Sequence, residues 1–175
     1  MVPHLPLDLV HPPEPRQKGN PLIEIHPSPT ADTRTCDFSQ VTKDTLFQSS
    51  LQHIHDVRQG FAFLKKLMDE AAYDHDYDKL TAIDHFHSDF TGGFAETGWW
   101  DNHRKVNRHH LLQPDGVPED VNLIDVLDLI TDCVMAGMAR SGSVYAITIP
   151  PEILQRAFDN TVDLLKRQVV VTPAE

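Results

Sequence analysis

The feature that most restricts the fold is a run of apolar residues spaced three and four apart between Asp44 and Met68. This periodicity predicts one amphipathic helix over residues 44–68, with its apolar side facing a core. The apolar stripe consists of Phe47, Leu51, Ile54, Val57, Phe61, Leu64 and Met68.

Comparable patterns predict further helices along the chain. Pro118 is expected at the first turn of a long helix, with Glu119 and Asp120 near the positive end of its dipole. Residues 88–98 contain three glycines and are expected to form a loop, and residues 143–149 (SVYAITI) are the only strand-like run of the body. We therefore predict an all-α body. The further helices are expected over residues 70–80, 99–112, 118–140 and, after Pro150-Pro151, 152–168.

Proline divides the chain unevenly, because eight of the 13 prolines fall within residues 1–42. Proline fixes φ and removes a backbone donor, so we expect an extended arm over residues 1–42. The segment PLIEIHPSP (residues 21–29) can add a short edge strand. The helical domain then covers residues 43–170, with a tail at 171–175. We expect the arm to lie on the body or on a neighbouring subunit. The second arrangement predicts a homo-oligomer.

Composition bounds the function classes. A chain of 175 residues that is 40% hydrophobic fits one globular domain. No apolar run reaches the roughly 20 residues of a membrane span, so no membrane partner is expected. The net charge of −11 argues against an extended nucleic-acid face. Two distant cysteines, Cys36 and Cys133, and the lack of a signal-peptide pattern favour a cytoplasmic setting.

Histidine is unusually frequent, with 11 residues, eight of them between His53 and His110. On the predicted first helix His53 faces inward, where a core histidine is the more common explanation. His75-Asp76 offers adjacent nitrogen and carboxylate ligands, or simply a solvated acidic turn.

Two further groups depend on helical spacing. His103, Asn107 and His110 would share one helix face, where burial demands partners such as a metal or an anion; the alternative is a surface histidine patch. Asp125, Asp128 and Asp132 also share a face of the long helix, where they either reach solvent or meet cations. Tryptophans Trp99 and Trp100 can stack a base, although core packing is more common for such a pair.

The order His53, His75-Asp76, His103, His110 and Asp132 resembles the HD-domain metal-dependent phosphohydrolase superfamily. The chain is more closely similar to a family of small phage and bacterial proteins of uncharacterised function. Its pattern is H-x3-V, HD-x-SKF followed by an acid, W-x2-H-x3-N-x-HH, and E-M-x2-D. The matches here cover about residues 50–140 and are His53 with Val57, His75 through Leu80 with Asp84, Trp100 through His110, and Asp128 through Asp132. The chain differs from the pattern at four positions. Asp78 replaces Ser, Leu80 replaces Phe, and Asp84 and Asp128 each replace Glu.

The resemblance implies an HD-domain-like helical bundle that binds one or two divalent metal ions (Mn, Fe, Co, Zn or Ni). It also implies that the protein acts in a bacterium or a phage-infected host cell. The implied reaction is hydrolysis of a nucleotide or related small phosphoester by metal-activated water. The implied metal ligands are His53, His75, Asp76, His103, His110 and Asp132. Asp76 also belongs to the implied catalytic set.

Other residues are expected to support that chemistry. Lys79, Arg104 and Arg108 can hold phosphate oxygens, or else carry ordinary surface charge. Asn107 can bind substrate or brace the site. Asp128 or Asp84 can orient a ligating imidazole. Two other functions use the same residues: a di-iron oxygenase, and a non-catalytic phage-encoded protein that binds a nucleotide or a host factor.

Overall fold

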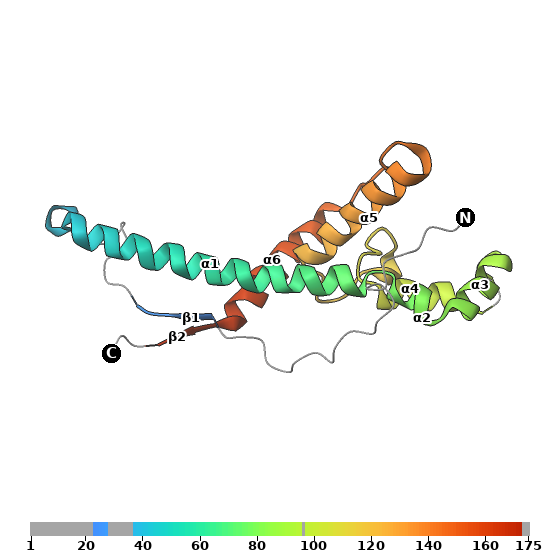
Figure 1. Ribbon diagram of the computed structural model, residues 1–175, viewed down its shortest axis with the longest axis horizontal. Coiled ribbons are helices and arrows are strands. Elements are labelled where there is room, and N and C mark those ends of the chain that lie inside the picture. Colours follow the sequence, from blue (N-terminus) through green and yellow to red (C-terminus); the bar gives the residue numbers. More distant parts are fainter. Residues whose placement is uncertain (1–22, 28–36, 96, 173–175) are drawn as a thin grey trace, which may run out of the picture.

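The computed structural model of the chain describes residues 23–27, 37–95 and 97–172 (Figure 1). The described part is all-α apart from one small parallel sheet, which confirms the predicted fold class. Most of the predicted arm and the end of the predicted tail lie outside the described residues. The helices are α1 (Lys43–Asp74), α2 (Tyr77–Thr81), α3 (Ile83–Thr91), α4 (Trp99–Val106), α5 (Leu123–Ser141) and α6 (Pro151–Gln168), with 3-10 turns η2 (Phe38–Gln40) and η3 (Pro114–Gly116).

Helix α1 is one continuous element of 32 residues, so the predicted division into helices over 44–68 and 70–80 is wrong. Its N-terminus is capped by Thr42, whose hydroxyl accepts a hydrogen bond from the Thr45 N–H at 3.1 Å. The helix ends at Asp74, because His75 has an extended ψ of 117° and Asp76 then adopts a left-handed conformation. At 1.5 Å per residue α1 is about 48 Å long.

The sheet joins the two ends of the described chain. β1 (Ile23–Ile25) pairs in parallel with β2 (Val169–Val171), and Ile23 lies opposite Val169. β1 confirms the predicted short strand within residues 21–29. The strand predicted at 143–149 is wrong, because these residues form no strand and instead cover α5, with Ile147 and Ile149 against the core.

Helix α5 lies at the centre of the core, where Val126, Leu129 and Cys133 pack with Ala157 of α6. Gly137 is required for this packing, since a Cβ there would lie 2.5 Å from the Ser143 carbonyl oxygen.

Three predicted boundaries differ from the structure. α5 starts at Leu123 and not at Pro118, because Asn122 and Asp125 form a capping box that satisfies its first N–H groups. α4 ends at Val106 instead of continuing to residue 112. α3 occupies part of the predicted loop at 88–98, which begins only at Gly92.

The apolar stripe of α1 does not face a core. Phe63, which lies outside the stripe, is the buried residue of this helix, whereas Phe47 and Phe61 are 57% and 67% exposed. The periodicity therefore predicted the helix correctly and its buried face wrongly. Within the described residues, no helix has the length and apolar character to cross a bilayer.

Candidate metal centre

A cluster of imidazoles and carboxylates lies where α1 ends, close to α4 and the middle of α5. The contributing side chains come from four places in the sequence. His75 and Asp76 follow α1, His103 belongs to α4, His109 and His110 follow α4, and Asp128 projects from α5.

The backbone at Asp76 directs its carboxylate into this cluster. Asp76 has φ 55° and ψ 14°, a conformation that costs a non-glycine residue roughly 1–2 kcal/mol. Asn107 stabilises it, because its Oδ1 accepts a hydrogen bond from the Asp76 N–H at 2.9 Å. The Asn107 Nδ2 donates to Asp78 Oδ1 at 2.9 Å. Asn107 thus braces the site, one of its two predicted roles.

Three imidazole nitrogens approach the Asp76 carboxylate. Oδ1 lies 3.3 Å from His103 Nε2 and 3.7 Å from His109 Nε2, and Oδ2 lies 3.6 Å from His75 Nε2. Two groups can hold a cation: His75, Asp76 and His109, and Asp76, His103 and His110, with ligand atoms within 4.8 Å of one another in each group. Because Asp76 belongs to both groups, the arrangement has room for one or two ions.

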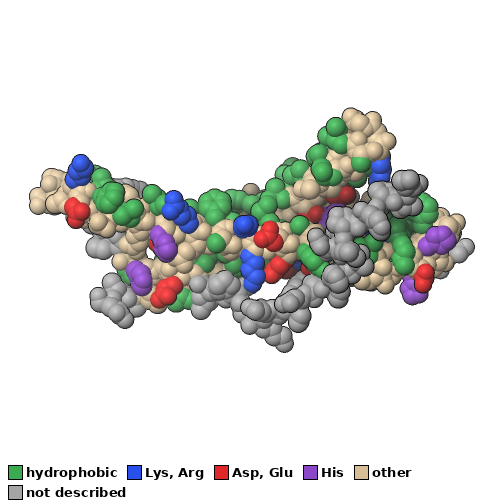
Figure 2. Space-filling model, in the orientation of Figure 1, with side chains coloured by type: hydrophobic (Ala, Val, Ile, Leu, Met, Phe, Trp, Pro, Cys, Tyr) green, Lys and Arg blue, Asp and Glu red, His purple; other side chains and the backbone are tan. Residues whose placement is uncertain are grey.

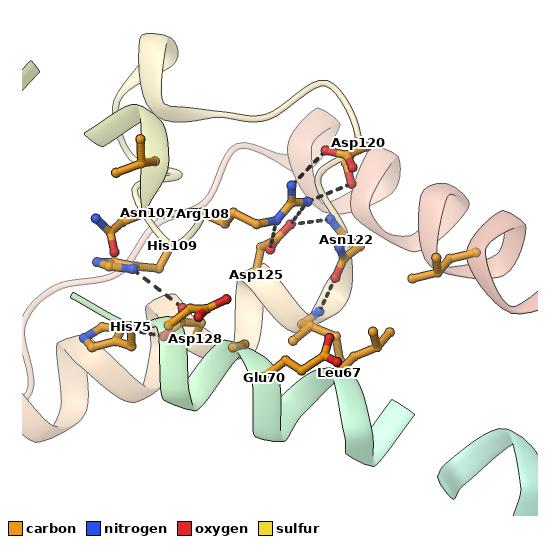
Figure 3. A pocket seen from close by; sticks show the side chains of 15 residues that line it. Leu67, Glu70, His75, Asn107, Arg108, His109, Asp120, Asn122, Asp125 and Asp128 are labelled. Carbon is orange, nitrogen blue, oxygen red and sulfur yellow. Dashed lines mark hydrogen bonds and ion pairs between the residues drawn. The ribbon is translucent and has the colours of Figure 1, made fainter. Parts of the chain in front are cut away.

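Aspartates lie beside the opposite nitrogens of these rings. His75 Nδ1 lies 2.8 Å from Asp128 Oδ1, and His103 Nδ1 lies 2.9 Å from Asp78 Oδ2. His109 Nδ1 lies 3.6 Å from Asp128 Oδ2, so Asp128 faces two rings (Figure 3). A carboxylate at Nδ1 favours the tautomer whose Nε2 lone pair is available to a metal.

Several buried polar atoms of the cluster lack a hydrogen bond within the described part of the chain. They are Asp76 Oδ1, His103 Nε2, His109 Nδ1 and His110 Nε2. The side chains of His103 and His109 are almost fully buried. A buried polar atom without a partner costs about 1–3 kcal/mol. Because His109 Nδ1 faces Asp128, the atoms that call for a ligand are Asp76 Oδ1, His103 Nε2 and His110 Nε2. A divalent cation fits this set of nitrogen and carboxylate donors.

The protonation states of Asp76, Asp128 and His110 suit a cation, whereas the hydrogen bond with Asp128 raises the pKa of His75. Burial opposes ionisation of Asp76, but hydrogen bonds with His103 and Lys79 hold its pKa well below the usual range. Burial likewise opposes ionisation of Asp128, yet contacts with His109 and His75 lower its pKa to about 2. Burial and the neighbouring His109 and His103 lower the pKa of His110 to about 3. Anionic carboxylates and a neutral His110 are therefore expected at pH 7, as metal binding requires.

Two hollows adjoin the His75–Asp128 pair. The first, of about 340 Å³, is lined by His75, His109 and Asp128 on one side and by Arg108 and Asp125 on the other (Figure 3). The second, of about 330 Å³, is mainly apolar. It is lined by Met68, Ala71, Ala72, His75, Ile124, Leu127, Asp128, Thr131, Asp132 and Met135.

Of the six predicted metal ligands, the structure brings four together: His75, Asp76, His103 and His110. Asp132 lies at the edge of this cluster, with Oδ1 3.9 Å from His75 Nε2 and the side chain 36% exposed.

His53 is not brought to the centre. It precedes His75 by 22 residues on one continuous helix, which separates the two by about 33 Å. Its side chain is exposed, so the prediction that it faces inward is wrong. The predicted ligand set assumed two separate helices over residues 44–68 and 70–80, which could fold back on each other. In the structure both segments belong to the single helix α1, so His53 stays far from His75.

The three predicted phosphate-binding cations differ in position. Lys79 contacts the cluster directly, because its Nζ donates to Asp76 Oδ2. Arg104 pairs with Asp101 and Asp115, away from the imidazoles.

Arg108 lines the first hollow but is already engaged. Its Nε and Nη2 bind Asp125, at 2.7 and 2.9 Å, and its Nη1 binds Asp120. The guanidinium therefore ties the segment after α4 to the start of α5.

Sequence reasoning missed His109 and Asp78 as members of the centre. A helix extended through residue 110 turns His109 away from His103, but α4 ends at Val106 and the chain then turns. The adjacent histidines 109 and 110 were the available signal. Asp78 was treated as a departure from the family pattern, yet it holds His103.

Three further residues complete the comparison between the predicted and the observed site. Asp84 is exposed on α3, so of the two predicted orienting residues Asp128 is the one at the centre. Trp99 is buried and stacks on His103 with ring centroids 4.7 Å apart, as its packing alternative predicts. Asp89, which the sequence did not single out, accepts the Thr97 and Trp100 N–H groups at the start of α4.

Comparison with known proteins adds no family to these observations. No protein-family model matches the chain, and neither the curated proteins nor the solved structures contain a match. The resemblance to the HD-domain superfamily therefore stays a prediction from the sequence.

Proposed function

We propose that this protein is a metal-dependent phosphohydrolase that acts on a nucleotide or a related small phosphoester. The observation that carries the proposal is the convergence of four imidazoles on the Asp76 carboxylate, with buried donor atoms that lack partners. The residue order that resembles HD-domain hydrolases supplies the reaction class.

The residues fit one or two divalent ions from the series Mn, Fe, Co, Zn and Ni. His75 and His109 would hold one position, His103 and His110 a second, and Asp76 would serve both. Bound there, such an ion lowers the pKa of a ligated water and neutralises charge on a phosphate. Asp128 and Asp78 fix the orientation of the imidazoles.

The surroundings support a small substrate. Each hollow beside His75 falls within the size range of small-molecule pockets. Lys79 at Asp76 places positive charge where phosphate oxygens would lie. Leu127 and Met135 in the second hollow offer apolar contacts for a base or another apolar group.

Elemental analysis combined with phosphate release tests the proposal. The protein, purified without chelator, is assayed on nucleoside mono- and triphosphates with Mn²⁺ or Co²⁺. We expect bound metal and released phosphate or pyrophosphate, both lost in Asp76→Asn and His103→Ala. His53→Ala is the matched control and should retain both, because His53 is exposed and remote.

Other outcomes would reject the proposal. Bound iron with O₂ consumption and no phosphate release would indicate the oxygenase. Nucleotide binding without turnover would indicate a binding protein. A metal-free protein would overturn both metal-dependent functions.

A further inference from the structure

Helix α1 exposes a long apolar stripe. Its two phenylalanines, Phe47 and Phe61, are more than half exposed, and Figure 2 shows hydrophobic side chains along the visible face of this helix. Monomeric proteins seldom expose a contiguous apolar surface of this length. The exposed members are Phe47, Leu51, Ile54, Val57, Phe61 and Met68, and Leu64 is half-buried.

Where α1 lies against β1, its covered face is polar, whereas Phe63 is buried further along the same helix. Gln52 and Gln59 donate side-chain hydrogen bonds to the backbone carbonyls of His26 and Glu24. At 100° per residue, this face lies nearly opposite the apolar stripe. α1 thus packs its polar side on β1 and leaves its apolar side outward, which is the reverse of the usual amphipathic arrangement.

The spacing of the stripe is symmetric about a point between Val57 and Arg58. Phe47 and Met68 are equally far from it, as are Leu51 and Leu64, and Ile54 and Phe61. Two antiparallel copies of α1 related by a two-fold axis at this point would place the members of each pair opposite one another. Such self-complementarity is what an isologous dimer contact requires.

We propose that the apolar stripe of α1 binds the same stripe of a second copy of this chain, with the two helices antiparallel. At about 200 Å² for a fully exposed large side chain, the exposed fractions amount to about 600 Å² per chain. Burial on both copies removes about 1,200 Å² of apolar surface alone, which reaches the size of a stable interface.

The pairing also extends to the candidate metal centre. Met68 lines the apolar hollow beside His75. In the antiparallel dimer Phe47 of the partner subunit contacts Met68 and closes that edge of the hollow. The dimer depends only on the apolar stripe, so its test is independent of the test of the proposed hydrolase activity.

Light scattering of the full-length chain tests the dimer. We expect the wild-type protein at about 40 kDa, twice the 19.8 kDa of one chain. The double variant Ile54→Glu/Phe61→Glu should run as a monomer with unchanged helical circular dichroism. Phe158→Glu is the matched control, since Phe158 of α6 is 54% exposed and outside the stripe, and it should remain dimeric.

Cross-linking with a short bis-maleimide tests the direction of the helices. In a Cys36→Ser/Cys133→Ala background, Arg58→Cys should link to itself across the two-fold axis. Phe47→Cys should not, because its two copies would lie about 30 Å apart, but it should link to Met68→Cys in a mixture. A monomeric wild type, a dimer that persists in the double variant, or efficient self-linking at position 47 would overturn the proposal. A monomeric wild type would instead indicate that residues 1–22 of the same chain cover the apolar stripe.

Discussion

Asp76 combines two roles at the residue scale. Its left-handed backbone ends α1, and its carboxylate lies within 3.7 Å of three imidazole nitrogens. Both depend on Asn107, which binds the Asp76 N–H and the Asp78 carboxylate at once. One amide side chain thus holds the turn and the residue that orients His103.

Removing that amide should therefore affect stability and metal binding together. Asn107→Ala leaves the Asp76 N–H without a partner, so we expect a loss of about 1–3 kcal/mol in the free energy of unfolding. Metal affinity should fall about 10- to 100-fold, as for other residues that orient ligands. Denaturant titration and metal titration measure the two effects. Asn102 is exposed on α4, so the control variant Asn102→Ala should change neither the free energy of unfolding nor the metal affinity.

Asp128 orients two imidazoles from α5. In Asp128→Asn the amide retains the shape but loses the negative charge beside His75 and His109. We expect metal affinity to fall about 10- to 100-fold. Isothermal titration with Mn²⁺ or Zn²⁺ measures this change. Affinity equal to wild type would show that Asp128 does not orient the ligands.

At the scale of single elements, two helical glycines give opposite predictions. A Cβ at Gly137 of α5 meets the backbone of Ser143 and Tyr145, whereas a Cβ at Gly60 of α1 meets nothing within 4 Å. Gly137→Ala should destabilise the fold by about 1–3 kcal/mol through overpacking. Gly60→Ala should stabilise it by about 0.5–1 kcal/mol through helix propensity. Thermal and denaturant unfolding of the two variants provide the comparison.

The elements also show which structural features can be predicted from a short stretch of sequence. Periodicity found α1 and α6, and the PLIEIHPSP segment found β1, because these signals lie within short stretches of chain. The start of α5 was misplaced, since the capping box of Asn122 and Asp125 prevails over Pro118. The end of α4 was missed because contacts of Asn107 with Asp76 and Asp78 draw the chain out of the helix.

At the scale of the whole molecule, the proposed metal binding should be coupled to folding. The centre is assembled from α1, α4, α5 and the segment after α4, so an ion bound there stabilises the folded state and not the unfolded chain. Chelation should lower the unfolding temperature, and excess Mn²⁺ or Zn²⁺ should restore it. Differential scanning calorimetry measures the shift. The Asp76→Asn variant should show no response to either treatment.

The sequence by itself determined that the chain is helical, and it identified His75, Asp76, His103 and His110 as residues that belong together. The first conclusion rests on local periodicity, and the second on the residue order that resembles the HD-domain superfamily. Tertiary structure decided the rest. His53 is remote because α1 does not break, and His109 enters the centre because α4 ends early. The apolar stripe of α1 faces outward because β1 takes its polar side. Spacing along the chain specifies which residues share a helix face, but only packing between distant segments determines what that face meets.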